Sequence, residues 1–369
     1  MKKENIVIFL GSILFIILIL EITIRIYDQI KGHSFFSNHR NLITKEIKPL
    51  RPFRTFGFEL YKKDLYGNKF ISSRHKELYP ITKPRNTFRI VVFGGSTSEN
   101  LSSFKKTKLH YPLIIEKKLK RIFNPVNIEV INVANSAYAT PHSLILLELD
   151  VISWKPDMII VSHNVNDLLA SYWPDFTFNY SNKYNNKFYS IPDYKSIFTL
   201  TNIIFQNSQL YWIIRDRISK LKKSNQSNLK RKSYGYTPPK LAIEVFERNL
   251  NSIITIAKSN KIKVLIANQP LQSSQEYFEK HMKNKSYNST ITYPLHSEFI
   301  NHHKLFNSIL INTAIKNEVM YIDNDSIFKN NKKYFIDFVH YTPAGVQKIA
   351  NNYLNYLQLN YSHLLQKNK

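Results

Sequence analysis

Short continuous apolar runs recur along this chain, and segments with the helical spacing of apolar residues lie between them. Unbroken runs rich in β-branched residues are typical of strands buried on both faces of a parallel sheet. Strands that alternate with helices predict a parallel sheet covered by helices on both faces. The predicted strands comprise the run at 90–93 and the segments 127–133, 157–162, 261–267 and 319–322.

The predicted helices repeat apolar side chains every three or four residues. In the segment 111–123, Ile115, Leu119 and Ile122 fall on one face, and Pro112 is tolerated in the first turn. The other predicted helices cover 140–154, 241–258 and 303–316, a segment around 210–221, and the C-terminal segment that begins at Thr342-Pro343.

The N-terminal segment has the length of a membrane span. Residues 6–20 carry no charge, and the apolar character continues to Ile24. In a helix, 6–24 covers roughly 28 Å, close to the thickness of a bilayer core. Lys2 and Lys3 favour an N-terminus inside and a main domain outside. A cleaved signal peptide is the alternative. We favour an uncleaved anchor, because the apolar segment is long and no clear small-x-small cleavage site follows it.

The sequence divides into three parts. Residues 1–31 are expected to form the anchor, 32–86 an irregular linker or strap, and 87–369 the main domain. That domain carries insertions at about 171–240 and 269–300. The first insertion could be a substrate lid or a membrane-surface helix. We favour a simpler interpretation, an insertion packed on the domain with a solvated basic loop.

The first candidate catalytic residue stands where the first predicted strand of the main domain ends. The run 90–93 stops at Gly94-Gly95, which allow backbone angles that other residues resist, and Ser96 follows. A serine in a tight turn at the carboxyl end of a buried strand lies where open α/β sheets bind ligands. Taken alone, this stretch fits equally well a plain strand-to-helix loop with a helix cap.

A second motif lies near the C-terminus, where Asp337 and His340 stand three residues apart. Two such side chains can lie on one side of a single turn. The Asp could then hold the imidazole tautomer while the His faces a serine. Together, the Gly-x-Ser turn after the first strand and the late Asp-x-x-His resemble the SGNH/GDSL ester hydrolase family, in its membrane-anchored bacterial form.

The resemblance spans roughly 88–358 and implies a fold and a site. The fold is a flavodoxin-like three-layer α/β/α sandwich around a central, mainly parallel five-stranded sheet. Ser96 is implied as the nucleophile, His340 as its general base and Asp337 as the partner of the His. The implied oxyanion hole consists of the backbone N–H groups of Ser96 and Ala134 and the side-chain amide of Asn166.

The chain departs from the family pattern at four positions. Gly95 stands where the family often has Asp, and Ala134, Ala137 and Asn164 stand where Gly is usual. Ala134 keeps its N–H but takes positive φ only at a cost, so we expect its loop to hold an ordinary conformation. His163 ends the third predicted strand and is a rival base, which we rank as a wall residue.

The amino-acid composition serves mainly to exclude classes of partner and of chemistry. Lys and Arg number 52 against 26 Asp and Glu, a formal net charge of +26. A polyanionic partner is one explanation, but we favour a Lys/Asn/Ile-biased genome, and without an aromatic-basic motif we expect no nucleic-acid binding. The chain has no Cys, which excludes disulfides and thiolate catalysis. We expect no metal or other cofactor, because His296, His302 and His303 lack a coherent ligand spacing.

These observations lead to three functional hypotheses. The first is an extracytoplasmic, single-pass membrane esterase that removes small acyl groups, such as acetyl, from a carbohydrate or cell-envelope glycan. The second is an O-acyltransferase that acts on a surface polysaccharide with the same residues. The third is an inactive glycan-binding or assembly protein, slightly favoured by Ala134 and Asn164 but opposed by the intact Ser96, Asn166 and His340. The oligomeric state is left open.

Overall fold

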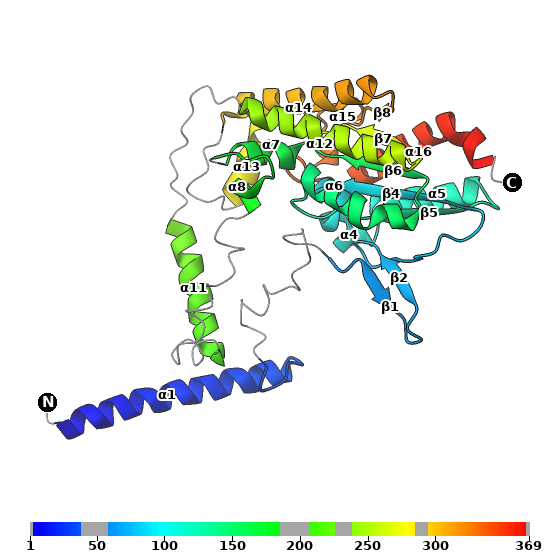
Figure 1. Ribbon diagram of the computed structural model, residues 1–369. Helices are drawn as coiled ribbons and strands as arrows, with labels where there is room; N and C mark the ends of the chain where they lie inside the picture. The colour runs from blue at the N-terminus through cyan, green and yellow to red at the C-terminus, as the bar shows by residue number, and fades with distance from the viewer. Residues whose placement is uncertain are drawn as a thin grey trace. The chain divides into compact units, whose positions relative to one another are not determined.

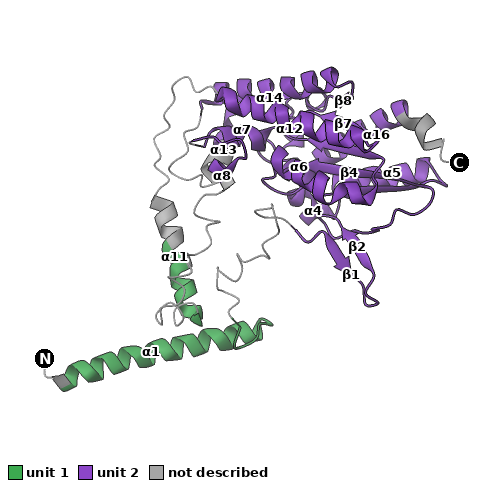
Figure 2. Cartoon of the chain, viewed as in Figure 1, with its two compact units in different colours: residues 1–56, 187–229 green, residues 57–186, 230–369 purple. Residues whose placement is uncertain are grey.

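The computed structural model describes residues 3–37, 58–173, 175–184, 207–225, 238–284 and 294–366. The chain forms two compact units, shown in green and purple in Figure 2. Unit 1 comprises residues 1–56 and 187–229, and unit 2 comprises 57–186 and 230–369.

Unit 2 is built on a five-stranded sheet in which all neighbouring strands run parallel (Figure 1). The strand order is β5-β4-β6-β7-β8, so the first strand of the sheet in sequence lies inside it. Every residue of β4 is buried, as its unbroken apolar run predicts. The strands are β4 (Thr87–Gly94), β5 (Asn127–Asn132), β6 (Met158–Ser162), β7 (Lys263–Ala267) and β8 (Met320–Ile322).

Helices cover both faces of this sheet, because side chains along each strand alternate between two cores. Val91 and Phe93 of β4 pack in a core with α6 (Thr140–Leu149), α12 (Lys240–Ser259) and α14 (His296–Lys316). Ile90 and Val92 pack in the opposite core with α5 (Tyr111–Ile122) and α16 (Pro343–Gln366). The predicted three-layer α/β/α sandwich is therefore confirmed.

Several elements differ from the predictions. The helix predicted over 140–154 ends at Leu149, and a 3₁₀ turn, η1 (Val151–Trp154), follows it. Helix α14 begins at His296, seven residues before the predicted start. The remaining short elements of unit 2 are α3 (Ser96–Glu99), α4 (Leu101–Thr107), α7 (Val165–Ser171), α8 (Ser181–Tyr184), α13 (Gln275–Asn284), α15 (Asp325–Phe328) and η2 (Lys332–Tyr334).

The segment predicted as an irregular strap contains a small sheet. Strands β1 (Tyr61–Lys63), β2 (Lys69–Ser72) and β3 (Leu78–Pro80) pair antiparallel in that order. At three or four residues each, they are too short to show a clear alternation of apolar and polar positions. The buried guanidinium of Arg89 ties this sheet to the domain by donating to the Pro80 carbonyl at 2.8 Å and to Glu129 at 2.6 Å.

Unit 1 contains α1 (Lys3–Ile30) and α11 (Gln209–Asn225). Residues 4–30 form a helix of 27 residues with mean hydropathy 2.8, long and apolar enough to cross a membrane, as a signal sequence also is. Glu21 is a charged residue in this otherwise apolar helix. Its carboxylate accepts the backbone N–H groups of Gln209 and Leu210, the first residues of α11, at 2.8 and 2.9 Å. The helix predicted around 210–221 is confirmed, whereas most of the basic run after it lies outside the described residues.

Candidate active site

Ser96 is the first residue of α3 and directly follows the turn that ends β4. Both glycines of this turn are needed for close packing. A Cβ on Gly94 would lie 2.4 Å from Ser98 Oγ, and a Cβ on Gly95 would lie 2.3 Å from the side-chain nitrogen of Asn166. Gly95 has an ordinary φ of −94°, so the close approach of Asn166, and not an unusual backbone angle, requires glycine here.

Ser96, His340 and Asp337 form one continuous hydrogen-bonded chain. His340 Nε2 lies 2.8 Å from Ser96 Oγ, although the two residues are 244 positions apart in sequence. On the other side of the ring, His340 Nδ1 lies 2.7 Å from Asp337 Oδ2. Since the carboxylate accepts from Nδ1–H, Nε2 is left as the acceptor for the serine hydroxyl. The structure thus brings together the three residues that the sequence motifs single out.

The Asp-x-x-His segment is a turn that Asp337 itself stabilises. Its Oδ1 accepts the backbone N–H groups of Val339 and His340 at 3.0 and 2.9 Å. The side chains of His340 and Asp337 are 16% and 19% exposed, and Ser96 is also half-buried among buried neighbours. The hydrogen-bonded chain is therefore both fixed and open to a substrate.

Asn166 lies in the first turn of α7, close to the Ser96 turn. Its side-chain amide donates to the Tyr138 carbonyl at 2.8 Å, which uses one of its two N–H bonds. The same nitrogen borders Gly95, the residue before Ser96. The N–H of Ser96 lies at the start of α3, where backbone N–H groups have no partner within the helix. These two groups are suitably placed to serve as oxyanion donors.

The backbone N–H of Ala134, which was expected to be an oxyanion donor, already has a hydrogen-bond acceptor. Its N–H donates to the side-chain oxygen of Asn132 at 3.1 Å, while Asn132 donates in turn to the Ser98 carbonyl at 3.1 Å. Ala134 keeps an ordinary backbone conformation, as predicted. Ala137 instead adopts a φ of 65°, in the left-handed region that glycine prefers. The departure from the family pattern therefore strains the loop at Ala137.

His163, the rival base, contacts a different serine. Its Nε2 lies 2.7 Å from Ser143 Oγ, and its Nδ1 lies 4.0 Å from Asp167. Burial lowers the pKa of His163 to about 3 and raises the pKa of Asp167 to about 6. Asp167 also accepts from the N–H and the hydroxyl of Thr140, at 3.0 and 2.6 Å. The contacts of His163 and Asp167 thus run to Ser143, Thr140 and Tyr180, and not to Ser96.

One buried residue on the short helix that carries Ser96 was not identified from the sequence. This residue is Glu99, at the end of α3. Its fully buried side chain pairs with Arg74 Nη2 at 2.5 Å and is also hydrogen-bonded to Ser136 Oγ. His75 Nε2 lies 2.5 Å from the Glu99 carbonyl. Arg74 and His75 belong to the strap, so the strap contacts the short helix that carries Ser96. An acidic residue three positions after Ser96 was the only sequence signal.

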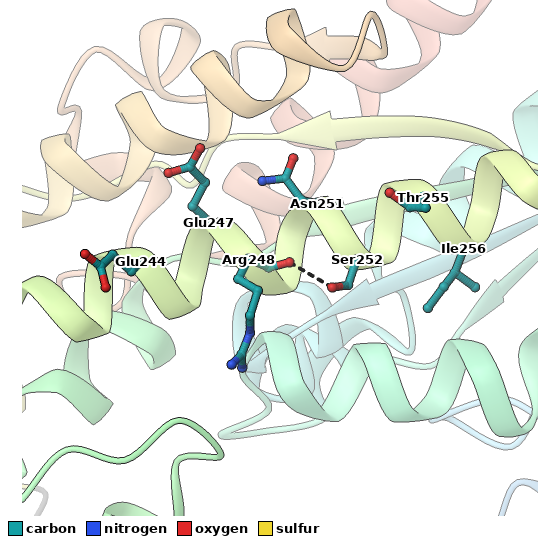
Figure 3. Close-up of a pocket in the computed structure, with 7 residues that line it drawn as sticks. All are labelled: Glu244, Glu247, Arg248, Asn251, Ser252, Thr255 and Ile256. Carbon is teal, nitrogen blue, oxygen red and sulfur yellow. Dashed lines mark hydrogen bonds between the residues drawn. The ribbon is translucent and has the colours of Figure 1, made fainter.

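The part of the chain that the structure describes has no metal site, and its surface hollow lies away from Ser96. Within those residues, no cluster of three His, Asp or Glu side chains could hold a metal ion. A surface hollow, shown in Figure 3, is lined entirely by residues of α12, including Glu247, Arg248 and Asn251. It contains neither Ser96 nor His340 and has no nucleophile–base pair.

The strand order and the position of Ser96 after the first strand of the sheet match the resemblance, and His340 joins Ser96 from the last loop. The sheet has the 2-1-3-4-5 strand order of a flavodoxin-like fold, which is the fold that the resemblance implies. Solved structures of similar fold include a catalytic mutant of an acetylxylan esterase from Geobacillus stearothermophilus, with 14% identity and a TM-score of 0.43 over 73% of this chain and 93% of that chain. Another is a GDSL-like lipase from Bacteroides thetaiotaomicron, with 13% identity and a TM-score of 0.41 over 73% and 88%.

Comparison at the sequence level finds nothing further. No family model matches the chain, and no curated protein matches it. The candidate site is defined by its own contacts and by the topology of the sheet.

Proposed function

We propose that this protein is a serine ester hydrolase with Ser96 as nucleophile, His340 as general base and Asp337 as the partner of His340. One observation carries the proposal: the unbroken chain of contacts from Ser96 Oγ through both nitrogens of His340 to Asp337, at 2.8 and 2.7 Å. A nucleophile within hydrogen-bonding distance of its base, with the base oriented by a carboxylate, is the arrangement that activates a serine.

The proposed reaction has two steps. Ser96 Oγ attacks the ester carbonyl while its proton moves to His340 Nε2, and Asp337 stabilises the imidazolium that forms. The charge on the carbonyl oxygen is met by the Asn166 amide and the Ser96 N–H. His340 then gives the proton to the departing alcohol, which leaves an acyl group on Ser96. Water, deprotonated by His340, then attacks the acyl carbon. The bond to Ser96 Oγ breaks, His340 returns the proton to Ser96 Oγ, and the acyl group leaves as a carboxylic acid.

The proposed substrates are small acyl esters, such as O-acetyl groups on a carbohydrate or cell-envelope glycan. This part of the proposal follows from the resemblance of the Gly-x-Ser and Asp-x-x-His motifs to the SGNH/GDSL family. In the same proposal, α1 anchors the protein in a bacterial membrane and the catalytic unit lies on the extracytoplasmic side. The uncharged stretch of α1 and the preceding Lys2 and Lys3 support this orientation.

An inactive binding protein is the competing function that one observation favours, because the Ala134 N–H already has an acceptor in Asn132. Two further donors, Ser96 N–H and the Asn166 amide, remain beside the serine. A retained nucleophile, base and carboxylate in mutual contact support the enzyme over the binding protein.

The test is hydrolysis of a short-chain aryl acetate by the full chain in detergent, beside Ser96→Ala. We expect hydrolysis that disappears with Ser96. Adding sugar acceptors then distinguishes transfer from hydrolysis, and an acetylated oligosaccharide compared with its butyrylated form tests the acyl preference. Equal rates for the wild type and Ser96→Ala would contradict the proposed function.

A further inference from the structure

One buried side-chain amide joins the two elements that carry the proposed nucleophile and oxyanion donor. Gln269, just after β7, donates from Nε2 to Thr97 Oγ1 at 2.6 Å. Its Oε1 accepts the backbone N–H of Val165 at 2.9 Å. Thr97 follows Ser96 in α3, and Val165 precedes Asn166 in α7. Each end of the Gln269 amide is therefore one residue away from a group of the proposed site.

Gln269 is itself held by a second amide. Asn307 of α14 accepts the Gln269 backbone N–H and donates to the Gln269 carbonyl, both at 3.2 Å. Asn164 then donates to Asn307 Oδ1 at 2.7 Å and to the His303 carbonyl at 2.9 Å. All these side chains are buried. Breaking either bond of the Gln269 side-chain amide would leave buried polar groups unpaired, so this part of the network resists distortion.

This network gives a reason for the departure at Asn164. The family usually has glycine at this position, which could not reach Asn307. Here the Asn164 side chain fixes the start of α7 to α14, two residues before Asn166. The start of α7 is thus held from two sides, by Gln269 at Val165 and by Asn307 at Asn164.

We propose that Gln269 is a positioning residue that sets the spacing between Ser96 and Asn166, with Asn164 and Asn307 holding its amide in register. The inference rests on the proposed ester hydrolase function. Gln269 acts only through Thr97 and Val165. Gln269 is suited to this role because its side-chain nitrogen bonds to α3 and its side-chain oxygen bonds to α7. The backbone pairing of β4 with β6 ends at Gly94 and Ser162, before either helix begins.

The kinetic test compares Gln269→Leu with the wild type on an aryl acetate. Because a small misplacement of reacting groups lowers the rate by up to about 100-fold, we expect kcat to fall by about 10- to 100-fold. KM should change less than about two-fold, because the interaction matters in the transition state and not in substrate binding. Thr97→Val should lower kcat similarly, Thr97→Ser should restore it, and the double variant should be no worse than Gln269→Leu.

Gln272→Leu is the matched control. Gln272 lies three residues further along the same loop and is equally buried. Its side chain donates to the Asn330 carbonyl at 2.8 Å and accepts the Ser274 N–H at 2.9 Å, away from α3 and α7. Its loss removes the same number of hydrogen bonds, so we expect a similar loss of stability with kcat close to wild type. Equal losses of kcat in both variants would overturn the positioning role.

A readout independent of activity separates this inference from the proposed function. Hydrogen exchange of the Val165 amide, measured on the full chain, should become faster in Gln269→Leu and stay unchanged in Gln272→Leu. Faster exchange in a protein that hydrolyses no ester would retain the bridge and reject the enzyme. Unchanged exchange at Val165 in Gln269→Leu would reject the bridge, whatever the activity.

Discussion

The described part of this domain contains two groups of Ser, His and Asp that share a close serine–histidine contact. They differ in burial and in the distance from the imidazole to the carboxylate. In both, a His Nε2 lies close to a Ser Oγ, at 2.8 and 2.7 Å. The distance from His Nδ1 to the carboxylate is 2.7 Å in one and 4.0 Å in the other. The first is the surface group, Ser96, His340 and Asp337, and the second is the buried group, Ser143, His163 and Asp167.

The difference shows what makes such a trio chemically competent. The His and Asp side chains of the surface group are 16% and 19% exposed, against 1% and 0% in the buried group. Asp167 also directs its oxygens at Thr140 and Tyr180, so it is not free to orient His163. A serine–histidine contact alone therefore does not mark an active site. Exposure of the group and a carboxylate within hydrogen-bonding distance of the imidazole are required as well.

The largest expected effect comes from changing the carboxylate of the surface group. Asp337→Asn can keep the turn, because its oxygen can still accept the N–H groups of Val339 and His340. It would, however, present an N–H to His340 Nδ1 and hold the wrong tautomer. We expect kcat for an aryl acetate to fall about 10⁴-fold, with KM little changed.

Ser143→Ala is the corresponding change in the buried group. It leaves His163 Nε2 without its partner, and we expect unfolding to become easier by about 1–3 kcal/mol while kcat stays within about two-fold of wild type. If Ser143→Ala lost activity as strongly as Asp337→Asn, the distinction between the two groups would be wrong.

The next effect concerns Asn166, which lies beside the surface group. Removal of one oxyanion donor typically costs about 100- to 1000-fold in kcat, and we expect a loss in this range for Asn166→Ala. Asn166→Asp keeps the shape but replaces the donor by an acceptor, so it should be impaired at least as much. Steady-state kinetics on the aryl acetate measure both, and full activity in Asn166→Asp would remove Asn166 from the oxyanion hole.

The buried group should appear in the pH dependence of stability. Burial lowers the pKa of His163 to about 3, so the native ring stays neutral at pH 5. In the unfolded chain a His with an ordinary pKa near 6.5 binds a proton there, so the free energy of unfolding falls as the pH falls, by up to about 2 kcal/mol between pH 7 and 5.

Other buried groups act on the same pH range. His142 and His303, whose pKa values burial also lowers to about 3, add to the loss of stability in acid. Asp167 opposes it in part, because its pKa is raised to about 6 and the native carboxyl takes up a proton first. Urea unfolding at pH 7 and 5 measures the slope, which should be smaller in His163→Gln. An identical slope in both proteins would show that His163 already titrates in the native state.

The smallest effect is expected in the loop that leads from β5 to α6, the helix that carries Ser143. Ala137 holds a φ of 65°, which is costly for a residue with a Cβ. Ala137→Gly should therefore stabilise the protein by roughly 0.5–1 kcal/mol after the entropic cost of glycine, without loss of activity. Ala134→Gly, at an ordinary φ, should instead destabilise it. Stabilisation by both would mean that strain at Ala137 is not the cause.

Much of the fold was predictable because it rests on strong local patterns. Strands β4, β6 and β7 contain unbroken apolar runs, and α5, α12 and α16 show clear helical spacing. The strands of the strap were missed because they are short and none of them contains an apolar run longer than two residues. Helix α13 was missed because the polar stretch around it resembled a surface insertion. The strap strands carry no clear alternation of apolar and polar positions, which is the pattern that sequence reasoning uses for strands.

The candidate site likewise has one part that the sequence could predict and another part that it could not. Ser96, Asp337 and His340 lie in compact motifs, and the resemblance of these motifs to the SGNH/GDSL family implied that the three residues meet. The engagement of Ala134 by Asn132 and the bridge from Gln269 to Thr97 could not be predicted, because they depend on side-chain directions of residues far apart in sequence. The strain at Ala137 was indicated only by the family's preference for glycine there.

The most direct test of the central claim is covalent labelling with a fluorophosphonate, which reacts with activated serines. The full chain is treated and the modified peptide is located by mass spectrometry, beside His340→Ala. We expect one adduct, on Ser96, which is lost in His340→Ala, and none on Ser143. An adduct on Ser143, or none on Ser96 in the wild type, would contradict the assignment of the surface group as the active site.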